Sequence, residues 1–361
     1  MTSRSPTASW SPPRPASSAT CGRPARTSAP RRGRSARRGA SGPLRSSSPS
    51  WRVGSASSSG ASNASSGAPG APPPRAGSRL SVGESLHPTA VVDPKALLGA
   101  GVRIGAYTIV GPEVALEDGV EVGHHVVLEG RVRVGAGSRI GHGSVVGAPP
   151  QDLKWKEGTP SGVRIGRGTT LREYATVHRA TRPDGWTSIG DHCLLMSMCH
   201  VAHDCRLGEG VIVINYAGIT GHCEIDEYAT VGGLTGVHPF SRIGAYAYVG
   251  GCSKVVADVP PYTTVDGAPA LARGINVVGL RRGGIGAADR RLLQAAFRIL
   301  YRSGLAPRTG VERIRDELPA TPYIVRLLQF IEASKRGICG PPRTGAAVPD
   351  DAPDSEGERV F

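Results

Sequence analysis

Residues 201–237 read VAHDCRLGEGVIVINYAGITGHCEIDEYATVGGLTGV, and a large aliphatic residue returns at every sixth position, from Val201 to Val237. This period fits neither regular element, because an α-helix repeats about every 3.6 residues and an extended strand every two. It indicates a short strand followed by a turn, with one large and one small side chain directed inward per repeat. Three such repeats make one coil, and stacked coils enclose a continuous aliphatic core. The stretch therefore predicts a parallel β-helix.

The same period extends far beyond this stretch, from Val92 to Val255. Two segments interrupt it. Residues 147–164 shift the phase and must bulge outward, and residues 179–188 replace about one repeat with a Pro- and Gly-containing loop. Insertions in repeat proteins usually lie on one functional face, so we expect these two segments to line a site.

Composition divides the chain into four parts. We expect the β-helix over residues 86–259 and a C-terminal α-helical domain over residues 260–337, where apolar residues return at helical spacing. Residues 1–80, rich in Arg, Ser and Pro, and residues 340–361 hold too few apolar residues for a core, and we expect both to be disordered. For residues 1–80 an over-called translation start is favoured over an anion-binding tail or a targeting segment.

The positive charge of the chain is concentrated in residues 1–80. The sequence holds 43 Lys and Arg against 29 Asp and Glu, and 13 of the Arg lie in residues 1–80 without any acidic residue. This leaves 30 basic and 29 acidic residues in the rest, a balance that excludes nucleic acid as the partner of the folded part. No apolar run approaches the roughly 18 residues of a transmembrane segment. Seven Cys, an odd number, without a secretory signal predict a cytoplasmic protein.

Cysteine and histidine residues gather in the middle of the repeat. Four cysteines occupy small inward positions, where we expect them to pack in the core and not to bind metal. They are Cys193, Cys199, Cys205 and Cys223. His203 and His222 lie off the inward positions and about one coil apart, so we expect them on adjacent rungs of one edge, with His200 and His238 nearby. An imidazole beside a carboxylate, here Asp204, is a general base suited to neutral pH.

Six short blocks in a fixed order carry a more specific resemblance. They are QDLKW from residue 151, MCHVAHDC from 198, GITGHCEI from 218, VGGCSKV from 249, DVPPY from 258 and GINVVGLRR from 274. Over about residues 86–337 the chain resembles the acyl-carrier-protein-dependent UDP-N-acetylglucosamine O-acyltransferases. The resemblance implies the left-handed form of the β-helix. It also implies transfer of a 3-hydroxyacyl chain from acyl carrier protein to the 3-hydroxyl of UDP-N-acetylglucosamine, the first step of lipid A synthesis.

The same resemblance implies a homotrimer with the site in the cleft between neighbouring subunits, without metal or other cofactor and without a transmembrane segment. It also assigns roles to single residues. His203 is similar to the catalytic base that takes the proton of the sugar 3-hydroxyl, and Asp204 to its partner. Gly251 matches the floor of the acyl groove, where glycine suits a longer chain, and Asn276 and Arg282 match residues near the nucleotide. The other matched pocket residues are Gln151, Asp152, Lys154, His200, Asn215, His222 and His238.

Three positions depart from the family pattern. Pro239 stands where Gln is common, Val278 where a Glu often contacts the nucleotide, and Gly283 where a second Arg is common. All three belong to the sugar-nucleotide side of the site. An acceptor with an amine in place of the 3-hydroxyl therefore stays open.

Other functions also stay open. One is a related enzyme that uses a different acceptor or acetyl-CoA, and another is a purely structural scaffold. A third is a zinc hydrase on the same fold, whose ligands would be His200, His203 and His222. For the acyltransferase, an acidic carrier protein would dock on basic residues of the C-terminal helices. These are Arg281, Arg282, Arg290, Arg291 and Arg298.

Overall fold

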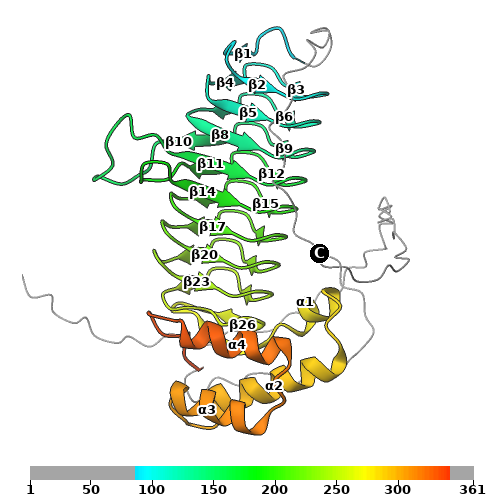
Figure 1. The fold of residues 1–361 in the computed structure, drawn as a ribbon, viewed down its shortest axis with the longest axis vertical. Coiled ribbons are helices and arrows are strands. Elements are labelled where there is room, and N and C mark those ends of the chain that lie inside the picture. The colour runs from blue at the N-terminus through cyan, green and yellow to red at the C-terminus, as the bar shows by residue number, and fades with distance from the viewer. Residues whose placement is uncertain (1–85, 342–361) are drawn as a thin grey trace, which may run out of the picture. The chain divides into compact units, whose positions relative to one another are not determined.

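A computed structural model describes residues 86–341, which form a parallel β-helix followed by α-helices (Figure 1). The segments expected to be disordered, residues 1–80 and nearly all of 340–361, lie outside the described residues. The chain passes from a first sheet to a second, a third and back to the first, so three flat sheets enclose one core.

Every strand of the three sheets is short, and neighbours within a sheet come from successive coils. Sheet 1 contains β1 (Val91–Val92), β4 (Ile109–Val110), β7 (Val127–Leu128), β10 (Val145–Ala148), β13 (Thr176–His178), β16 (His200–Val201), β19 (Gly218–Ile219), β22 (Gly236–Val237) and β25 (Lys254–Val255). Sheet 2 contains β2 (Leu97–Leu98), β5 (Val114–Leu116), β8 (Arg131–Val134), β11 (Gly162–Ile165), β14 (Trp186–Ile189), β17 (Arg206–Leu207), β20 (Glu224–Ile225) and β23 (Arg242–Ile243). Sheet 3 contains β3 (Arg103–Ile104), β6 (Glu121–Val122), β9 (Arg139–Ile140), β12 (Thr170–Leu171), β15 (Leu194–Leu195), β18 (Ile212–Val213), β21 (Thr230–Val231), β24 (Tyr248–Val249), β26 (Thr263–Asp266) and β27 (Leu271–Ile275).

The register of the sheets follows from the period of the sequence. Val201 pairs with Ile219, and Val213 with Val231, so each residue pairs with its equivalent one coil further along the chain. All of these side chains are buried in the core, as the sequence predicted. The four cysteines of the inward positions are buried there too, and burial raises the pKa of Cys199 to about 12, so this thiol packs as a neutral group.

Both interruptions of the repeat lie at the same corner of the prism. The loop between β10 and β11, residues 149–161, leaves the body of the coil and projects outward on the left of Figure 1. The loop between β13 and β14, residues 179–185, also connects sheet 1 to sheet 2. The expectation that the two segments share one face is confirmed.

The parallel sheet continues beyond residue 259, where we expected the β-helix to end. β26 pairs in parallel with β24, Val265 opposite Val249, and β27 then pairs antiparallel with β26. The six-residue sequence pattern ends at Val255, but the backbone still forms the next rung. A strand that adds to an existing sheet edge needs no particular side chain to complete its backbone hydrogen bonds.

Four helices follow within the described residues. They are α1 (Val277–Arg282), α2 (Ala287–Arg302), α3 (Pro307–Glu317) and α4 (Pro322–Glu332). The last three match the predicted helical spacing, and α1, too short to show a period, was not predicted. Leu293, Ile314 and Leu327 from these three helices share a second apolar core with Tyr262 of the last coil. The helices therefore close the C-terminal end of the prism.

Candidate active site

Three residues meet in the turns that join sheet 1 to sheet 2, and we call them the histidine corner: His203, Asp204 and His222. His203 and Asp204 follow β16, and His222 follows β19 one coil later. Asp204 and His222 both have left-handed backbone conformations, with φ of 59° and 62°, as do equivalent turn residues in many other coils. The two imidazole rings lie 5.1 Å apart, edge to face. The predicted stacking on one edge is confirmed.

Asp204 is the centre of the hydrogen bonding at this corner. Its side chain is 2% exposed, and Oδ2 accepts from His203 Nδ1 at 2.9 Å. The same oxygen accepts from the Thr181 hydroxyl at 2.7 Å and the Thr181 amide at 3.0 Å. Burial alone would raise the pKa of Asp204, but the bonds from Thr181 and His203 outweigh it and hold the pKa below its ordinary value. Asp204 is thus ionised at neutral pH.

The contact with Asp204 holds His203 in one tautomer. An ionised carboxylate can only accept, so the proton of the neutral imidazole sits on Nδ1 and Nε2 keeps a free lone pair. The ring, 14% exposed, lies against the backbone of Gly221 on the next coil. A Cβ on residue 221 would lie closer than 3.0 Å to Cε1 of His203, so a larger residue there would displace the ring. This arrangement is that of a general base with its carboxylate partner.

His222 packs on an aromatic residue that the sequence alone did not single out. Its ring stacks on Phe240 with centroids 4.5 Å apart and planes within 3°. Asp204, His222 and Phe240 follow one another at intervals of one coil, so the coil period could have found Phe240. His238, which we expected on this edge, is exposed and its Nδ1 lies 3.0 Å from Arg336 Nη1. Burial lowers the pKa of His222 despite the attraction of Asp204, so its imidazole is neutral.

Two further histidines line sheet 1 beside the corner. His200 Nδ1 hydrogen-bonds the Thr176 hydroxyl at 2.7 Å, and its ring packs edge to face on His178 at 4.8 Å. Burial and the nearby His200 lower the pKa of His178 to about 4, and burial also lowers the pKa of His200. His178 was not predicted, although it ends β13, one coil before the MCHVAHDC block. Both rings stay neutral at physiological pH, so they add polarity without charge.

The projecting loop brings part of the predicted pocket to the histidine corner. Asp152 is close enough for its carboxylate to oppose the lowering of the His222 pKa. Its Oδ1 accepts the Lys154 amide at 2.9 Å, while the Gln151 and Lys154 side chains are exposed. Trp155 anchors the loop, because the Arg179 guanidinium lies 5.2 Å from its ring centroid.

Four predicted residues lie elsewhere in the chain. Asn215 and Gly251 follow β18 and β24, in turns that join sheet 3 to sheet 1, so sheet 1 separates them from His203. Asn276 caps α1: its Oδ1 accepts the Gly279 amide at 3.0 Å and its Nδ2 donates to the Tyr246 carbonyl at 2.8 Å. Arg282 is the exposed last residue of α1. One chain alone therefore does not assemble all of the predicted pocket.

The three departures from the family pattern cluster in part around α1. Val278 is an exposed residue of α1, and Gly283 ends it. A Cβ at Gly283 would lie closer than 3.0 Å to the Tyr246 ring, which accounts for the loss of a long side chain at this position. Pro239 lies between His238 and Phe240, and its carbonyl lies 3.1 Å from the His238 Nδ1.

The ligand set of the zinc alternative is not brought together. Donor atoms of His203, Asp204 and His222 lie within 4.8 Å of one another, and within residues 86–341 no other group of this kind is found. His200, the third ligand in that alternative, is not in the group, and its Nδ1 hydrogen-bonds the Thr176 hydroxyl. The bonds of Asp204 to Thr181 and His203 explain the cluster without an ion.

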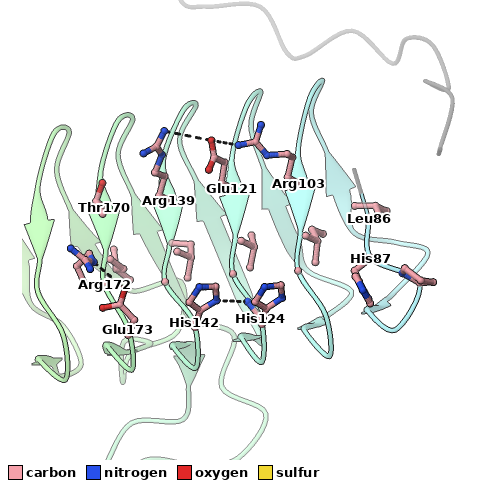
Figure 2. A pocket seen from close by; sticks show the side chains of 18 residues that line it. Leu86, His87, Arg103, Glu121, His124, Arg139, His142, Thr170, Arg172 and Glu173 are labelled. Atoms are coloured by element: carbon pink, nitrogen blue, oxygen red, sulfur yellow. Dashed lines mark hydrogen bonds and ion pairs between the residues drawn. The ribbon is translucent and has the colours of Figure 1, made fainter. Parts of the chain in front are cut away.

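A separate hollow of about 750 Å³ lies on the outer face of sheet 3, near its first strands. Figure 2 shows Glu121 between Arg103 and Arg139, and the parallel rings of His124 and His142 beside them. Each ring uses Nδ1 to accept a backbone amide of the preceding coil, and the carboxylate is shared by the two arginines. These groups satisfy one another, and none of the histidine corner lines the hollow.

Comparisons with known proteins cover nearly the whole described part of the chain. The family model described as "Udp N-acetylglucosamine O-acyltransferase; Domain 2" matches residues 258–339. An acyl-[acyl-carrier-protein]–UDP-N-acetylglucosamine O-acyltransferase of Thermodesulfovibrio yellowstonii is 44% identical over 255 residues, 70% of this chain and 98% of the relative. The enzyme of the same name from Trichlorobacter lovleyi is 51% identical over 259 residues, 71% of this chain and 99% of the relative.

Solved structures agree. A UDP-N-acetylglucosamine acyltransferase from Bacteroides fragilis matches with a TM-score of 0.67 and 35% identity, covering 70% of this chain and 98% of that one. The enzyme from Francisella novicida matches with a TM-score of 0.69 and 32% identity, covering 72% and 95%. The predicted fold, a left-handed parallel β-helix with C-terminal helices, is confirmed. With relatives this similar matched over almost their entire length, the chain belongs to the family of acyl-[acyl-carrier-protein]–UDP-N-acetylglucosamine O-acyltransferases.

Proposed function

We propose that this chain transfers an acyl group from acyl carrier protein to UDP-N-acetylglucosamine, the first step of lipid A biosynthesis, with His203 as the general base. Relatives that are 44% and 51% identical carry the name of this activity. The observation that carries the assignment of the base is the 2.9 Å bond between His203 Nδ1 and the buried Asp204 carboxylate. It leaves Nε2 as the basic atom of the pair.

The reaction moves one proton and transfers one acyl group. Nε2 of His203 takes the proton of the sugar 3-hydroxyl while the hydroxyl oxygen attacks the thioester carbonyl carbon of a 3-hydroxyacyl donor. The ester C–O bond forms, the C–S bond breaks, and the carrier thiol leaves with the proton from the imidazolium. Asp204 stabilises the imidazolium between these steps. Positioning of the two substrates supplies much of the remaining acceleration.

We infer that the polar residues around the corner hold the sugar nucleotide. Lys154 on the projecting loop is exposed beside Asp152, and a mobile ammonium there suits a substrate oxygen that gains negative charge. Arg282 offers a planar guanidinium for phosphate oxygens, and Asn276 fixes the helix that carries it. Gln151, His200, His222 and His238 complete the proposed pocket.

The active unit is proposed to be a homotrimer. His203 lies at the corner between sheets 1 and 2, and Asn215 and Gly251 lie at the corner between sheets 3 and 1. If the first corner of one chain meets the second corner of the next, a head-to-tail contact closes a ring with the pocket residues in each cleft. Exposed apolar side chains on both corners support this contact. They are Leu153 on the first, and Tyr174, Met198, Tyr216 and Leu234 on the second.

The acyl chain is proposed to run along the second corner past Gly251. Gly251 is exposed there, and a longer side chain would occupy this part of the surface. A longer 3-hydroxyacyl chain is therefore expected, and Gly251→Met is expected to shift the preference to a shorter one. Rates with carrier-linked chains of several lengths measure both, and an unchanged preference in the variant would contradict this role of Gly251.

A cytoplasmic location is proposed with this activity. No helix in residues 86–341 has the length and apolar character of a membrane span. Of the cysteines in this part of the chain, all six are free thiols and five are buried. Free thiols suit a reducing compartment. We also propose that the acidic carrier protein docks near Arg281, Arg282, Arg291 and Arg298, which are exposed, and Arg290, whose Nη1 donates to the Ile285 carbonyl.

The experiment is an acyl-transfer assay with purified chain, carrier-linked 3-hydroxyacyl donors and UDP-N-acetylglucosamine. His203→Ala is expected to lower kcat by at least about 10²-fold, the range of a lost general base. His192→Asn is the matched control, because His192 is exposed at another corner and asparagine tolerates its left-handed backbone. Near-normal turnover of His203→Ala would overturn the assignment. The same assay with a 3-amino sugar nucleotide decides the acceptor that Pro239, Val278 and Gly283 leave open.

A further inference from the structure

The loop that interrupts the repeat at residues 179–185 reaches the histidine corner through one residue. Thr181 directs both its backbone amide and its hydroxyl to Oδ2 of Asp204, at 3.0 and 2.7 Å. This is the same oxygen that His203 Nδ1 contacts at 2.9 Å. Two of the three hydrogen bonds on this oxygen therefore come from the loop of the preceding coil and not from the turn that carries the base.

The other carboxylate oxygen of Asp204 has far less support. Within residues 86–341, Oδ1 is buried and has no hydrogen-bond partner. The cation paired with it is the mostly exposed Arg182 guanidinium, whose Nε lies 3.8 Å from Oδ1. A buried carboxylate without donors loses much of its preference for the charged form. The charge of Asp204 thus depends on Oδ2, and there mainly on Thr181.

The loop also fixes where Asp204 points. The backbone amide of Asp204 donates to the hydroxyl of Thr187 at 2.8 Å, just after the loop enters β14. Thr181 therefore holds the carboxylate of Asp204, and Thr187 of β14 holds its backbone, both from the same preceding coil. This matters because Asp204 has a left-handed backbone with φ of 59°, a conformation that its surroundings must maintain.

We propose that Thr181 is a positioning residue of the acyl-transfer site, which holds the Asp204 carboxylate ionised and aimed at Nδ1 of His203. The inference rests on the proposed role of His203 as the base. Its consequence is chemical: with Asp204 in place the proton of the imidazole stays on Nδ1, and Nε2 is the atom that accepts the substrate proton. Without the hydroxyl of Thr181, the carboxylate is free to turn and part of the His203 population carries its proton on Nε2, where it cannot act.

Other charged and titratable groups face Asp204 and His203, and a substitution of Thr181 leaves them in place. His222 Nε2 lies 3.8 Å from Asp204 Oδ2, and Asp152 faces His222 from the projecting loop. His178 and His200 lie beside His203 on sheet 1. In the described part of the chain none of these four groups donates a hydrogen bond to Asp204, so they cannot replace the hydroxyl of Thr181.

The test is Thr181→Val, which removes the hydroxyl but keeps the shape and the backbone amide. We expect kcat to fall about 10-fold, the effect of one lost hydrogen bond to a charged group, with KM for UDP-N-acetylglucosamine nearly unchanged. Thr181→Ser keeps a hydroxyl and is expected to recover at least half of the wild-type kcat. Thr170→Val on the outer face of sheet 3 is the matched control for the loss of a threonine hydroxyl.

A spectroscopic readout separates positioning from a structural role. Nitrogen NMR of 15N-histidine-labelled protein at about pH 8 distinguishes an imidazole protonated on Nδ1 from one protonated on Nε2. We expect His203 to be protonated on Nδ1 in the wild type and in Thr181→Ser, and to show a mixture in Thr181→Val. An unchanged tautomer together with unchanged kcat in a folded Thr181→Val protein would overturn the inference.

Two controls keep the outcomes distinct. If Thr181→Val does not fold, the tautomer is read in Thr181→Ala, and a ring still fully protonated on Nδ1 counts against the inference. His203→Ala is assayed in parallel. If that variant keeps its activity, the proposed base is wrong. If it is inactive while Thr181→Val behaves as the wild type, the base stands and the role of Thr181 is rejected.

Discussion

At the scale of single residues, close packing on the coil sets the geometry of the proposed base. His203 lies against Gly221 of the next coil, so its ring position depends on an absent side chain as much as on the Asp204 bond. Small residues occur at many turn positions of the repeat. Gly221 differs from them because the His203 ring packs against it, so its size affects the position of the ring. Catalytic geometry tolerates little displacement, since misplacement by about 1 Å can lower the rate about 10²-fold.

Gly221→Ala is expected to displace His203, because the new Cβ would lie closer than 3.0 Å to its Cε1. We expect kcat to fall about 10-fold or more, with Tm lowered by a few degrees at most. Gly218→Ala is the matched control, since a Cβ there meets nothing within 4 Å. Activity assays and thermal unfolding of the two variants check this. Equal kcat in both would show that the ring tolerates the shift.

At the scale of elements, one loop and one helix each make a side-chain contact with the coil that a single substitution removes. The projecting loop rests on the stack of Trp155 and Arg179, and α4 is tied to the coil by the ion pair of Arg326 and Glu227. The loop brings Asp152 and Lys154 to the site, while α4 belongs to the closing helices. Loss of the first contact should therefore change activity, and loss of the second should change stability.

Trp155→Ala is expected to loosen the projecting loop and to lower kcat/KM for UDP-N-acetylglucosamine about 10-fold, mainly through KM. The physical reason is that Asp152 loses its fixed place near His222, and the neighbouring Lys154 moves with the loop. Trp186→Ala, on the outer face of sheet 2 among Arg131, Arg133 and Arg164, removes a similar stack outside residues 149–161 and is the control. Steady-state kinetics compare them, and equal losses in both variants would rule out a specific role of the loop.

Arg326→Met is expected to lower Tm by about 2 °C at neutral pH, a modest effect because both partners are about one-third exposed. Hydrogen bonds from Arg326 hold the pKa of Glu227 below its ordinary value. A lowered folded-state pKa adds stability above the unfolded value of about 4.3, and this stability is lost as the pH falls through the folded value. The Tm difference should therefore narrow below about pH 4. Arg313→Met, which breaks an exposed pair with Glu317, should change Tm little at any pH.

At the scale of the whole molecule, the residues of the proposed pocket lie at two different corners. Sheet 1 lies between His203 at the first corner and Asn215 at the second. The projecting loop carries Leu153, whose side chain is fully exposed and gives the first corner an apolar surface. The proposed association of identical chains would bring the two corners together and cover Leu153.

Light scattering of the wild type is expected to give three times the chain mass of 37.4 kDa. Leu153→Asp is expected to weaken the trimer and to make specific activity depend on protein concentration, because a charge would be buried in the contact. Leu97→Asp on the first coil of sheet 2 is the control, since Leu97 is also exposed but lies on neither corner. A wild-type monomer at assay concentration would refute the trimer.

Repetition explains how much of the fold was predictable. Each hexapeptide carries its own large and small inward residue. The register seen in the pairing of Val201 with Ile219 is therefore specified again in every coil, and a single irregular repeat does not change it. The stacking of residues at the histidine corner follows from the same coil period, which separates Asp204, His222 and Phe240 along the chain. The end of the β-helix was less predictable, because β26 forms a further rung by backbone hydrogen bonds where the six-residue sequence pattern is no longer present.

By itself, the sequence determined the parallel β-helix, the buried cysteines, the adjacent rungs of His203 and His222, and the family to which the chain belongs. The tertiary structure decided which partners complete the corner. Thr181 and Asp152 come from loops without a period, and only the folding of those loops onto sheet 1 brings them to Asp204 and His222. The physical reason is that contacts which recur in every coil fix the register of a repeat. The position of a loop depends instead on individual contacts with residues that are distant in the sequence.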